Sequence, residues 1–326
     1  MNQAHYRTVR TFLTGCMCCL IASCGDYRNA NSTSRYTENR AELESRLKAI
    51  IEGRPGQVGI AVLYNNQDTL LINNSSDYPM MSMFKLHEAI AVCHALDAQA
   101  TSTDTLIPIH REELDRETWS PMLQDYMANS FSVSVKELLD YTLVHSDNNT
   151  SNLLFQRIVS PTETDRYIRS ILPEGDFNIS YSEADMKRNI AKSYDNRTSP
   201  LSYVCLLNRV FTDSIVSRDK QELIRDAMAR CRTGAERIAA GIPDDGNIYF
   251  AHRTGSGYTN SRGEIIAVND GAYVRPPNGK GYAIVVLIKD FGGEENAAER
   301  LIAELSAAVY DYITLLNCGL PAAPDD

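Results

Sequence analysis

The sequence predicts an α/β fold of the α+β type, in which helices flank one antiparallel five-stranded sheet and an all-helical domain is inserted. Two observations predict it. Patterns typical of strands occur over 58–72 and 248–289, and a helix-rich stretch lies between them, from about 106 to 228. The simplest layered arrangement that buries both groups of strands joins them in one sheet. A site between the sheet and the helices would then draw residues from both.

The first third of the chain alternates between helical and strand patterns. Residues 37–51 carry acids early, apolar side chains at helical spacing and a Gly-Arg-Pro-Gly end, which predicts an amphipathic helix. Val58–Tyr64 and Thr69–Ile72 are β-rich runs joined by four polar residues, which predicts a hairpin. Ser82–Ala98 is mostly apolar and predicts a helix that is buried on most sides.

The rest of the chain is first helical and then returns to strands. Helices are expected over Val135–Leu143 and Ser151–Ile158, and a polar loop over Glu174–Pro200. Short strands separated by Gly, Pro and Asn turns are expected over Ile248–His252, Ile265–Val268 with Ala272–Val274, and Tyr282–Lys289. A final amphipathic helix is expected over Glu295–Leu316.

Length and charge limit the classes of partner. The 326 residues can bury a large core, and 43% hydrophobic with 23% charged residues is ordinary for a globular protein. A formal net charge of -10 argues against nucleic acid as a partner. A monomer is the default expectation.

The first residues have the pattern of an export signal. Arg7 and Arg10 precede a short apolar stretch that ends in Leu20-Ile21-Ala22-Ser23-Cys24, which matches a bacterial lipoprotein cleavage box. We therefore expect residues 1–23 to be a signal peptide, Cys24 to be lipidated, and residues 24–36 to form a flexible tether. The protein would be periplasmic or anchored to the outer membrane, touching the membrane only through this lipid. A plain secretory signal with an incidental cysteine is the alternative.

The eight cysteines do not indicate a metal site. The four beyond Cys24 are Cys93, Cys205, Cys231 and Cys318, which are widely spaced and form no CxxC pair. Cys93 and Cys205 lie in apolar helical patterns typical of core residues. One disulfide could form in an oxidising compartment, but the sequence does not say which.

Three short motifs together supply the groups needed for acyl transfer. In Ser82-Met83-Phe84-Lys85 the serine and lysine share a helix face, and a lysine in an apolar site can lose its proton and act as a base. Two other Ser-x-x-Lys patterns, at Ser45 and Ser217, lie in charged surroundings and are read as solvated helix faces. Alone, the Ser82 pattern would also fit a capping serine beside a surface lysine.

The second and third motifs are equally ambiguous on their own. Ser146-Asp147-Asn148 fits a helix start, but its serine could also pass a proton to a leaving nitrogen. Arg253-Thr254-Gly255-Ser256 follows a strand, so a guanidinium there could bind a carboxylate and a strand NH could supply half of an oxyanion hole.

In order and spacing, these motifs resemble the class A serine β-lactamases, within the penicillin-recognising serine hydrolases. The resemblance runs from about residue 37 to residue 316 and implies a β-lactamase/transpeptidase-like fold. It looks closest to the cephalosporinase-leaning branch with an altered Ω-loop. Trp119-Ser120-Pro121 resembles the family's aromatic gatekeeper, and Thr233-Gly234-x-x-Arg237 matches a place where some members hold a carboxylate-binding arginine.

The resemblance implies hydrolysis of the β-lactam amide of penicillins and cephalosporins through a Ser82 acyl-enzyme, and so antibiotic resistance. It implies no metal and no organic cofactor. The Ser82 and Ser256 NH groups would hold the oxyanion, and Asp147 would fix its loop. The implied catalytic residues are Ser82, Lys85, Ser146 and Glu183, and the implied substrate-binding residues are Asn148, Arg253, Thr254, Ser256, Trp119 and Arg237.

Turnover depends on a base that hydrolyses the acyl ester, and Glu183 resembles the family's glutamate for this step. Competing loop acids are Glu163, Glu174, Asp176 and Asp185. Two positions depart from the family pattern. Arg253 replaces a lysine, which keeps the charge but cannot release a proton. Lys187 replaces an amide, and could either pair with Glu183 or point to solvent.

Two other functions share these motifs. One is a penicillin-binding D-alanyl-D-alanine carboxypeptidase or a sensor that is acylated without turnover. The other is a non-catalytic envelope lipoprotein that binds peptidoglycan. In all cases we expect one catalytic domain over 37–318, with an α/β part at about 37–80 and 235–318, a helical part at about 81–234, and a tail at 319–326.

Overall fold

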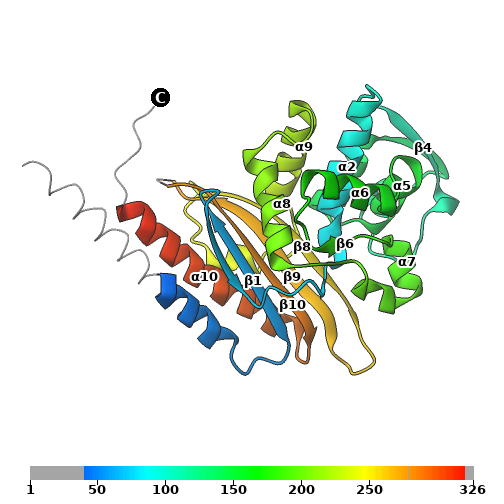
Figure 1. The fold of residues 1–326 in the computed structure, drawn as a ribbon. Helices are drawn as coiled ribbons and strands as arrows, with labels where there is room; N and C mark the ends of the chain where they lie inside the picture. Colours follow the sequence, from blue (N-terminus) through cyan, green and yellow to red (C-terminus); the bar gives the residue numbers. More distant parts are fainter. Residues whose placement is uncertain (1–39, 278, 320–326) are drawn as a thin grey trace, which may run out of the picture. The chain divides into compact units, whose positions relative to one another are not determined.

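The structure, a computed structural model, describes residues 40–277 and 279–319 (Figure 1). The chain divides into two compact units, residues 1–42 and 43–326. Of the first unit the structure describes residues 40–42, which are helical. The predicted signal peptide, the tether and Cys24 lie outside the described residues. All that follows concerns the second unit.

The elements alternate between the two ends of the chain and its helical middle. The strands are β1 (Gln57–Tyr64), β2 (Asp68–Ile72), β3 (Tyr78–Pro79), β4 (Leu106–His110), β5 (Ser130–Ser134), β6 (Phe177–Asn178), β7 (Arg197–Thr198), β8 (Tyr249–Thr259), β9 (Ile265–Arg275) and β10 (Tyr282–Phe291). A first α-helix ends at residue 51. The α-helices that follow are α2 (Phe84–Ala98), α3 (Met122–Asp125), α4 (Val135–Val144), α5 (Asn148–Arg157), α6 (Pro161–Ile171), α7 (Glu183–Arg188), α8 (Pro200–Thr212), α9 (Arg218–Ala229) and α10 (Glu295–Gly319). Short 3-10 turns are η1 (Met81–Met83), η2 (Arg111–Glu113), η3 (Ile190–Tyr194) and η4 (Ile238–Gly241).

The main sheet confirms the predicted fold class. Its five strands follow the order β2-β1-β10-β9-β8, and all neighbouring pairs are antiparallel. β1, from the start of the chain, pairs with β10, from its end, with Ile60 opposite Val286. Two smaller sheets, β3-β7-β6 and β4-β5, lie within the rest of the unit.

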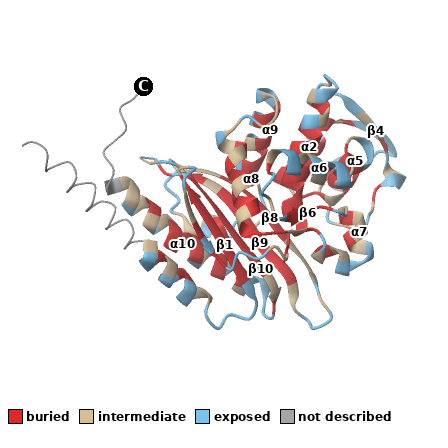
Figure 2. Ribbon diagram, viewed as in Figure 1, coloured by how far each residue is buried: buried red, intermediate tan, exposed pale blue. Residues whose placement is uncertain are grey.

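Both faces of the main sheet are covered, which explains why β1 and β10 are apolar along most of their length. Successive side chains of a strand point to opposite faces. Ala61 and Leu63 join the core that contains α8, whereas Ile60 and Val62 join the core that contains α10. Figures 1 and 2 show the buried strands running between these helices.

Helix α2 is the centre of the helical part. Residues 83–93 are all buried, and α2 packs against α4, α5, α6 and α9. A helix that is apolar on all sides is stable only when it is surrounded. The helix was predicted to begin at Ser82, but Ser82 lies in the preceding turn η1, and α2 begins at Phe84.

Strand β8 is longer than its sequence pattern suggested. The expected strand ended at His252, but β8 continues to Thr259, so the Arg253-Thr254-Gly255-Ser256 motif lies within it. The physical reason is the ladder with β9, which pairs Arg253 with Gly271 and Ser256 with Val268. β8 is the edge strand of this sheet, and its other side lies against η1.

The predicted loop at 174–200 contains short ordered elements, namely β6, α7, η3 and β7. The buried Asn196 organises it. Its Oδ1 accepts hydrogen bonds from the NH groups of Ser180 and Tyr181, and its Nδ2 donates to the Tyr181 carbonyl. These contacts fix the turn that precedes Glu183. Among the helices of residues 40–277 and 279–319, none has the length and apolar character that crossing a membrane requires.

Candidate active site

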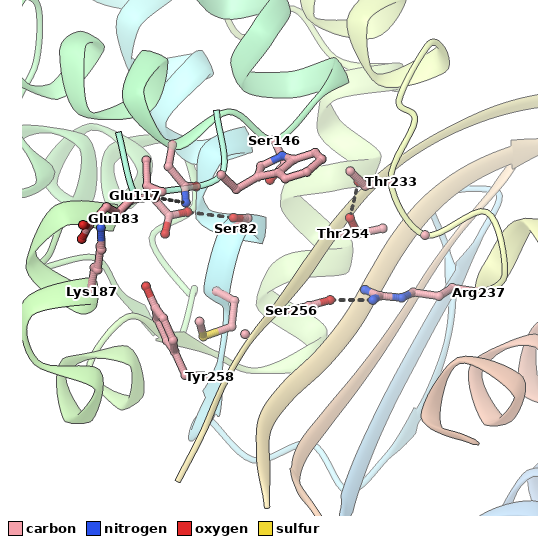
Figure 3. Close-up of a pocket in the computed structure, with 16 residues that line it drawn as sticks. Ser82, Glu117, Ser146, Glu183, Lys187, Thr233, Arg237, Thr254, Ser256 and Tyr258 are labelled. Atoms are coloured by element: carbon pink, nitrogen blue, oxygen red, sulfur yellow. Dashed lines mark hydrogen bonds between the residues drawn. The ribbon is translucent and has the colours of Figure 1, made fainter. Parts of the chain in front are cut away.

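A cleft of 360 Å³ lies where η1, the start of α5, α7 and β8 meet (Figure 3). It is open to solvent on one side, and its surface combines apolar area with several convergent polar groups, as in typical small-molecule sites. The lining residues are Met81, Ser82, Glu117, Thr118, Trp119, Ser146, Asn148, Glu183, Lys187, Thr233, Gly234, Arg237, Thr254, Ser256, Gly257 and Tyr258.

Ser82 lies between a carboxylate and an amine at the floor of this cleft. Its Oγ donates to Glu183 Oε1 at 2.7 Å and lies 3.1 Å from Lys85 Nζ. Lys85 Nζ and Glu183 Oε1 are 2.9 Å apart. The structure thus brings the Ser82 and Glu183 side chains into direct contact. The serine hydroxyl therefore has two adjacent groups able to remove its proton.

Lys85 is fully buried beneath Ser82. Its Nζ also contacts the Ser146 carbonyl at 2.9 Å, the Ser146 Oγ at 3.4 Å and the Asn148 Oδ1 at 2.7 Å. Burial lowers the pKa of Lys85, as does the nearby Arg253 charge, while Glu183 opposes this shift. A lysine with a depressed pKa is a better base near neutral pH.

The Ser146-Asp147-Asn148 motif combines both readings of its sequence. Asp147 is fully buried, caps α5 through the Thr150 NH, and accepts hydrogen bonds from Ser120 Oγ and the Met122 NH. Ser146 adopts a left-handed backbone conformation, with φ of 59°. Such strain persists where the surroundings enforce it, often at functional sites. Asp147 thus holds the turn that presents Ser146 to the cleft.

Asn148 lines the cleft and also supports Lys85. Its Oδ1 accepts from Lys85, and its Nδ2 donates to Thr118 Oγ1 at 2.9 Å. An amide nitrogen has two N–H groups, so the second is available for the substrate carbonyl expected from the sequence.

Gly255 brings strand β8 unusually close to the Ser82 turn. A Cβ atom at this position would lie 2.3 Å from the Met80 carbonyl oxygen and 3.0 Å from the Met83 nitrogen. No side chain fits at these distances, so the glycine of the motif is required for the close approach. This contact places Thr254 and Ser256 on the cleft wall opposite Glu183.

Arg253 does not occupy the position expected from the sequence. We expected it to bind a substrate carboxylate, but it is fully buried and does not line the cleft. Its guanidinium donates to the Ser82 carbonyl at 3.0 Å, the Leu143 carbonyl at 3.1 Å and Ser146 Oγ at 2.7 Å. The long arginine reaches past the strand into the protein, where all three contacts are satisfied. Arg253 is therefore a positioning residue that joins the Ser82 and Ser146 segments.

On the β8 side of the cleft the positive charge comes from Arg237. Its Nη2 donates to Ser256 Oγ at 2.5 Å (Figure 3). The same nitrogen donates to Glu295 Oε1 at 3.0 Å. Beside it, the hydroxyls of Thr233 and Thr254 are 2.5 Å apart. A guanidinium with several hydroxyls is a suitable site for a carboxylate.

The loop acids that competed with Glu183 have other contacts or positions. Glu163 and Asp185 complete the N-terminal caps of α6 and α7. Glu174 is exposed, and Asp176 lies 3.9 Å from Arg197. Among these acids, only Glu183 lines the cleft.

Lys187 follows neither alternative that its sequence position left open. It lines the cleft, and its Nζ pairs with Asp115 Oδ2 at 2.6 Å rather than with Glu183. Asp115 comes from the charged segment after β4, which the sequence pattern marks only as surface. The hydrogen bond and charge of Lys187 lower the pKa of Asp115.

Trp119 forms an exposed rim of the cleft, with 62% of its surface accessible. Its Nε1 donates to the His145 carbonyl at 2.8 Å, which fixes the ring beside the Ser146 turn. Sequence reasoning missed the cleft residues Glu117, Thr118 and Tyr258, because they belong to no motif.

The sequence and structure are similar to those of known β-lactamases. The model of the β-lactamase enzyme family matches residues 42–313. A β-lactamase of Phocaeicola vulgatus is 44% identical over 271 residues, covering 83% of this chain and 84% of the relative.

Two solved structures share the fold closely. The extended-spectrum β-lactamase TLA-3 has 30% identity and a TM-score of 0.80, covering 83% of this chain and 98% of its own. A class A β-lactamase from Bacteroides cellulosilyticus has 28% identity and a TM-score of 0.80, covering 86% and 99%.

These similarities extend over the cleft and the surrounding fold and do not favour the penicillin-binding or non-catalytic alternatives. The chain belongs to the β-lactamase enzyme family and is a class A serine β-lactamase, which hydrolyses β-lactams and confers resistance to them.

Proposed function

We propose that Ser82 attacks the lactam carbonyl and that Glu183 is the base that hydrolyses the resulting acyl-enzyme. One observation carries this proposal: Ser82 Oγ lies within 3.1 Å of both Glu183 Oε1 and Lys85 Nζ in the cleft. Either group can take the serine proton as the C–O bond forms.

Ser146 then donates a proton to the lactam nitrogen as the C–N bond breaks. Its Oγ lies 3.4 Å from Lys85 Nζ and 2.7 Å from Arg253 Nη2, which orient it toward the leaving group. Protons can thus pass from Ser82 to Lys85 and on to Ser146. The Ser82 and Ser256 NH groups stabilise the oxyanion of the tetrahedral intermediate.

The substrate carboxylate binds the β8 wall of the cleft. Thr254 and Ser256 supply hydroxyls there, and Arg237 supplies the positive charge. Glu295 and Glu299 partly neutralise the charge of Arg237. We therefore expect Arg237 to strengthen the binding of a substrate with one negative charge only moderately.

Cephalosporins are the proposed preferred substrates. This rests on the resemblance to the cephalosporinase-leaning branch and on the similarity to TLA-3, an extended-spectrum β-lactamase. A kcat/KM for a cephalosporin below that for benzylpenicillin would contradict this preference without affecting the residue roles.

The test of the residue roles is a pair of loop variants assayed with a chromogenic cephalosporin. Glu183→Gln keeps the shape of the side chain but removes its basicity, so we expect one equivalent of product followed by arrest. Mass spectrometry should then find the acyl group on the Ser82 peptide. Glu174→Gln, at an exposed position of the same loop, is the matched control and should turn over normally. Turnover of Glu183→Gln at the wild-type rate would contradict the assignment of the base.

Export and lipid anchoring at Cys24 complete the proposal, and they rest on the sequence of residues 1–24. The wild-type protein, if lipidated, should partition into the detergent phase, and the Cys24→Ala variant should not. Recovery of wild-type protein in the aqueous phase would contradict lipidation. The domain is proposed to be a monomer, which light scattering of the protein starting after Cys24 can test.

A further inference from the structure

A cysteine, a histidine and an aspartate meet behind the β8 wall of the cleft. Cys231 follows α9 and is partly exposed, while His252 on β8 and Asp270 on β9 are buried. The register of the sheet places Asp270 beside His252, because Asp270 pairs with the Thr254 position of β8. None of the three has a role in the mechanism proposed above.

His252 is held between the other two side chains. Its Nδ1 lies 3.1 Å and 3.3 Å from the two carboxylate oxygens of Asp270. The pKa of His252 is also raised by the neighbouring Cys231 side chain, so the two groups interact electrostatically. A protonated imidazole has two N–H groups, so one can face the carboxylate while the other faces the sulfur. The order Asp270, His252, Cys231 resembles the geometry by which a histidine activates a thiol.

The charges of this cluster favour a thiolate. Burial would lower the pKa of His252, but the charge and hydrogen bond of Asp270, together with Cys231, raise it to about 10. Burial would likewise raise the pKa of Cys231, but His252, the Arg253 charge and the Thr233 hydroxyl lower it to about 6. Both shifts act in the direction that favours a thiolate beside an imidazolium.

The charged and titratable groups around the sulfur come from three elements. His252 and Arg253 face it from β8, and Tyr203 interacts with it from α8. Asp270, on β9, acts through His252. The two cations dominate, because burial raises the pKa of Tyr203 and keeps that phenol neutral.

The other described thiols differ. Cys93 is fully buried and burial raises its pKa to about 12, and burial also raises the pKa of the partly exposed Cys205. The cluster therefore sets Cys231 apart from the free cysteines whose side chains the structure describes.

Cys231 is also coupled to the cleft. Its Sγ lies 3.4 Å from Thr233 Oγ1, which in turn is 2.5 Å from Thr254 Oγ1. The next residue, Gly234, is packed so tightly that a Cβ atom there would lie 2.6 Å from Thr254 Cγ2. A group attached to the sulfur would lie close to Thr233, so we expect it to disturb the cleft wall on which the substrate carboxylate is proposed to bind.

We propose that Cys231 is a modification site, at which the thiolate exchanges with a low-molecular-weight disulfide and the resulting adduct inhibits the enzyme. The Cys231 sulfur attacks one sulfur of the disulfide, a new S–S bond forms, the original S–S bond breaks, and a free thiolate leaves. The exchange needs no other oxidant, and a reducing thiol reverses it.

The test treats the folded protein with 2-hydroxyethyl disulfide, a small neutral probe, between pH 4.5 and 9. Adducts are located by peptide mass mapping, and activity is followed with a chromogenic cephalosporin. We expect labelling of the Cys231 peptide with a pH midpoint near 6, well below the ordinary thiol value of about 8.5. At pH 6.5 a larger fraction of Cys231 than of an ordinary thiol is ionised, but a thiolate of lower pKa is a weaker nucleophile. Together these effects give an exchange rate about five-fold above that of an ordinary exposed thiol.

Activity should fall in step with labelling of Cys231 and return on reduction with dithiothreitol. Cys231→Ser should keep its own starting activity through the treatment, whereas the matched control Cys205→Ser should be inhibited like the wild type. His252→Gln, where it folds, should shift the labelling midpoint upward. Failure to label Cys231 in the folded protein, a midpoint above 8, or labelling that leaves activity unchanged would each overturn the proposal.

Discussion

Replacing Arg253 by lysine tests how much the buried guanidinium holds the active site together. Arg253 donates to the Ser82 carbonyl, the Leu143 carbonyl and Ser146 Oγ, and it has no exposed surface. A lysine keeps the charge, but one ammonium cannot reach three groups set around a planar fork. We therefore expect Arg253→Lys to keep one contact and to lose two.

The loss should be large for a single substitution. A hydrogen bond from a charged donor contributes about 1.5–3 kcal/mol when buried, so two lost bonds lower the free energy of unfolding by about 3–6 kcal/mol. For a domain of this size, about 2–4 °C of Tm is lost per kcal/mol, which gives a fall of roughly 6–24 °C. The turn bearing Ser146 loses its anchor, so kcat should fall as well.

The assay is thermal unfolding followed by circular dichroism, with the chromogenic cephalosporin for activity. Arg218→Lys is the matched control, because the Arg218 side chain is 91% exposed and pairs only with a neighbouring carboxylate on the same helix. This exposed pair contributes little, so the control should change stability by less than about 0.5 kcal/mol. A Tm of Arg253→Lys as high as that of the control would refute the assigned role of the three hydrogen bonds.

Three further substitutions test separate parts of the structure. Gly255→Ala puts a Cβ atom 2.3 Å from a main-chain oxygen and should abolish most activity, whereas Gly292→Ala, whose nearest neighbour is 3.7 Å away, should be nearly neutral in the same assay. Burial raises the pKa of Glu88, so the folded protein holds a proton that the unfolded chain releases above about pH 4.5. Stability of the wild type should therefore fall relative to Glu88→Gln as pH rises from 5 to 8, and urea midpoints that differ by a constant amount would contradict this. Lys187→Ala should leave the single-turnover rate of deacylation within about three-fold of wild type, because Lys187 pairs with Asp115 rather than with Glu183. A ten-fold change would correspond to about 1.4 kcal/mol. A rate increase beyond three-fold would mean that Lys187 acts on Glu183.

Much of the fold followed from the sequence because its signals are local. The apolar run of β1, the hairpin to β2 and the mostly apolar α2 are properties of neighbouring residues, and burial on both faces of a sheet or around a helix produces them directly. Gly255 belongs to a motif that was recognised from order and spacing, although its close approach to the Ser82 turn became visible only in the structure.

The sequence by itself therefore determined the class of fold and the family, and it predicted a catalytic set that remains a prediction. Tertiary structure alone decided how they are used. Arg253 and Ser82 are 171 residues apart, and only the pairing of β8 with β9 and its packing on η1 turn the guanidinium inward rather than toward substrate. Lys187 and Asp115 are 72 residues apart, and the Cys231–His252–Asp270 cluster joins three segments. Such contacts have no periodicity for a sequence pattern to reveal, since they depend on which side chains long-range packing brings within hydrogen-bond distance.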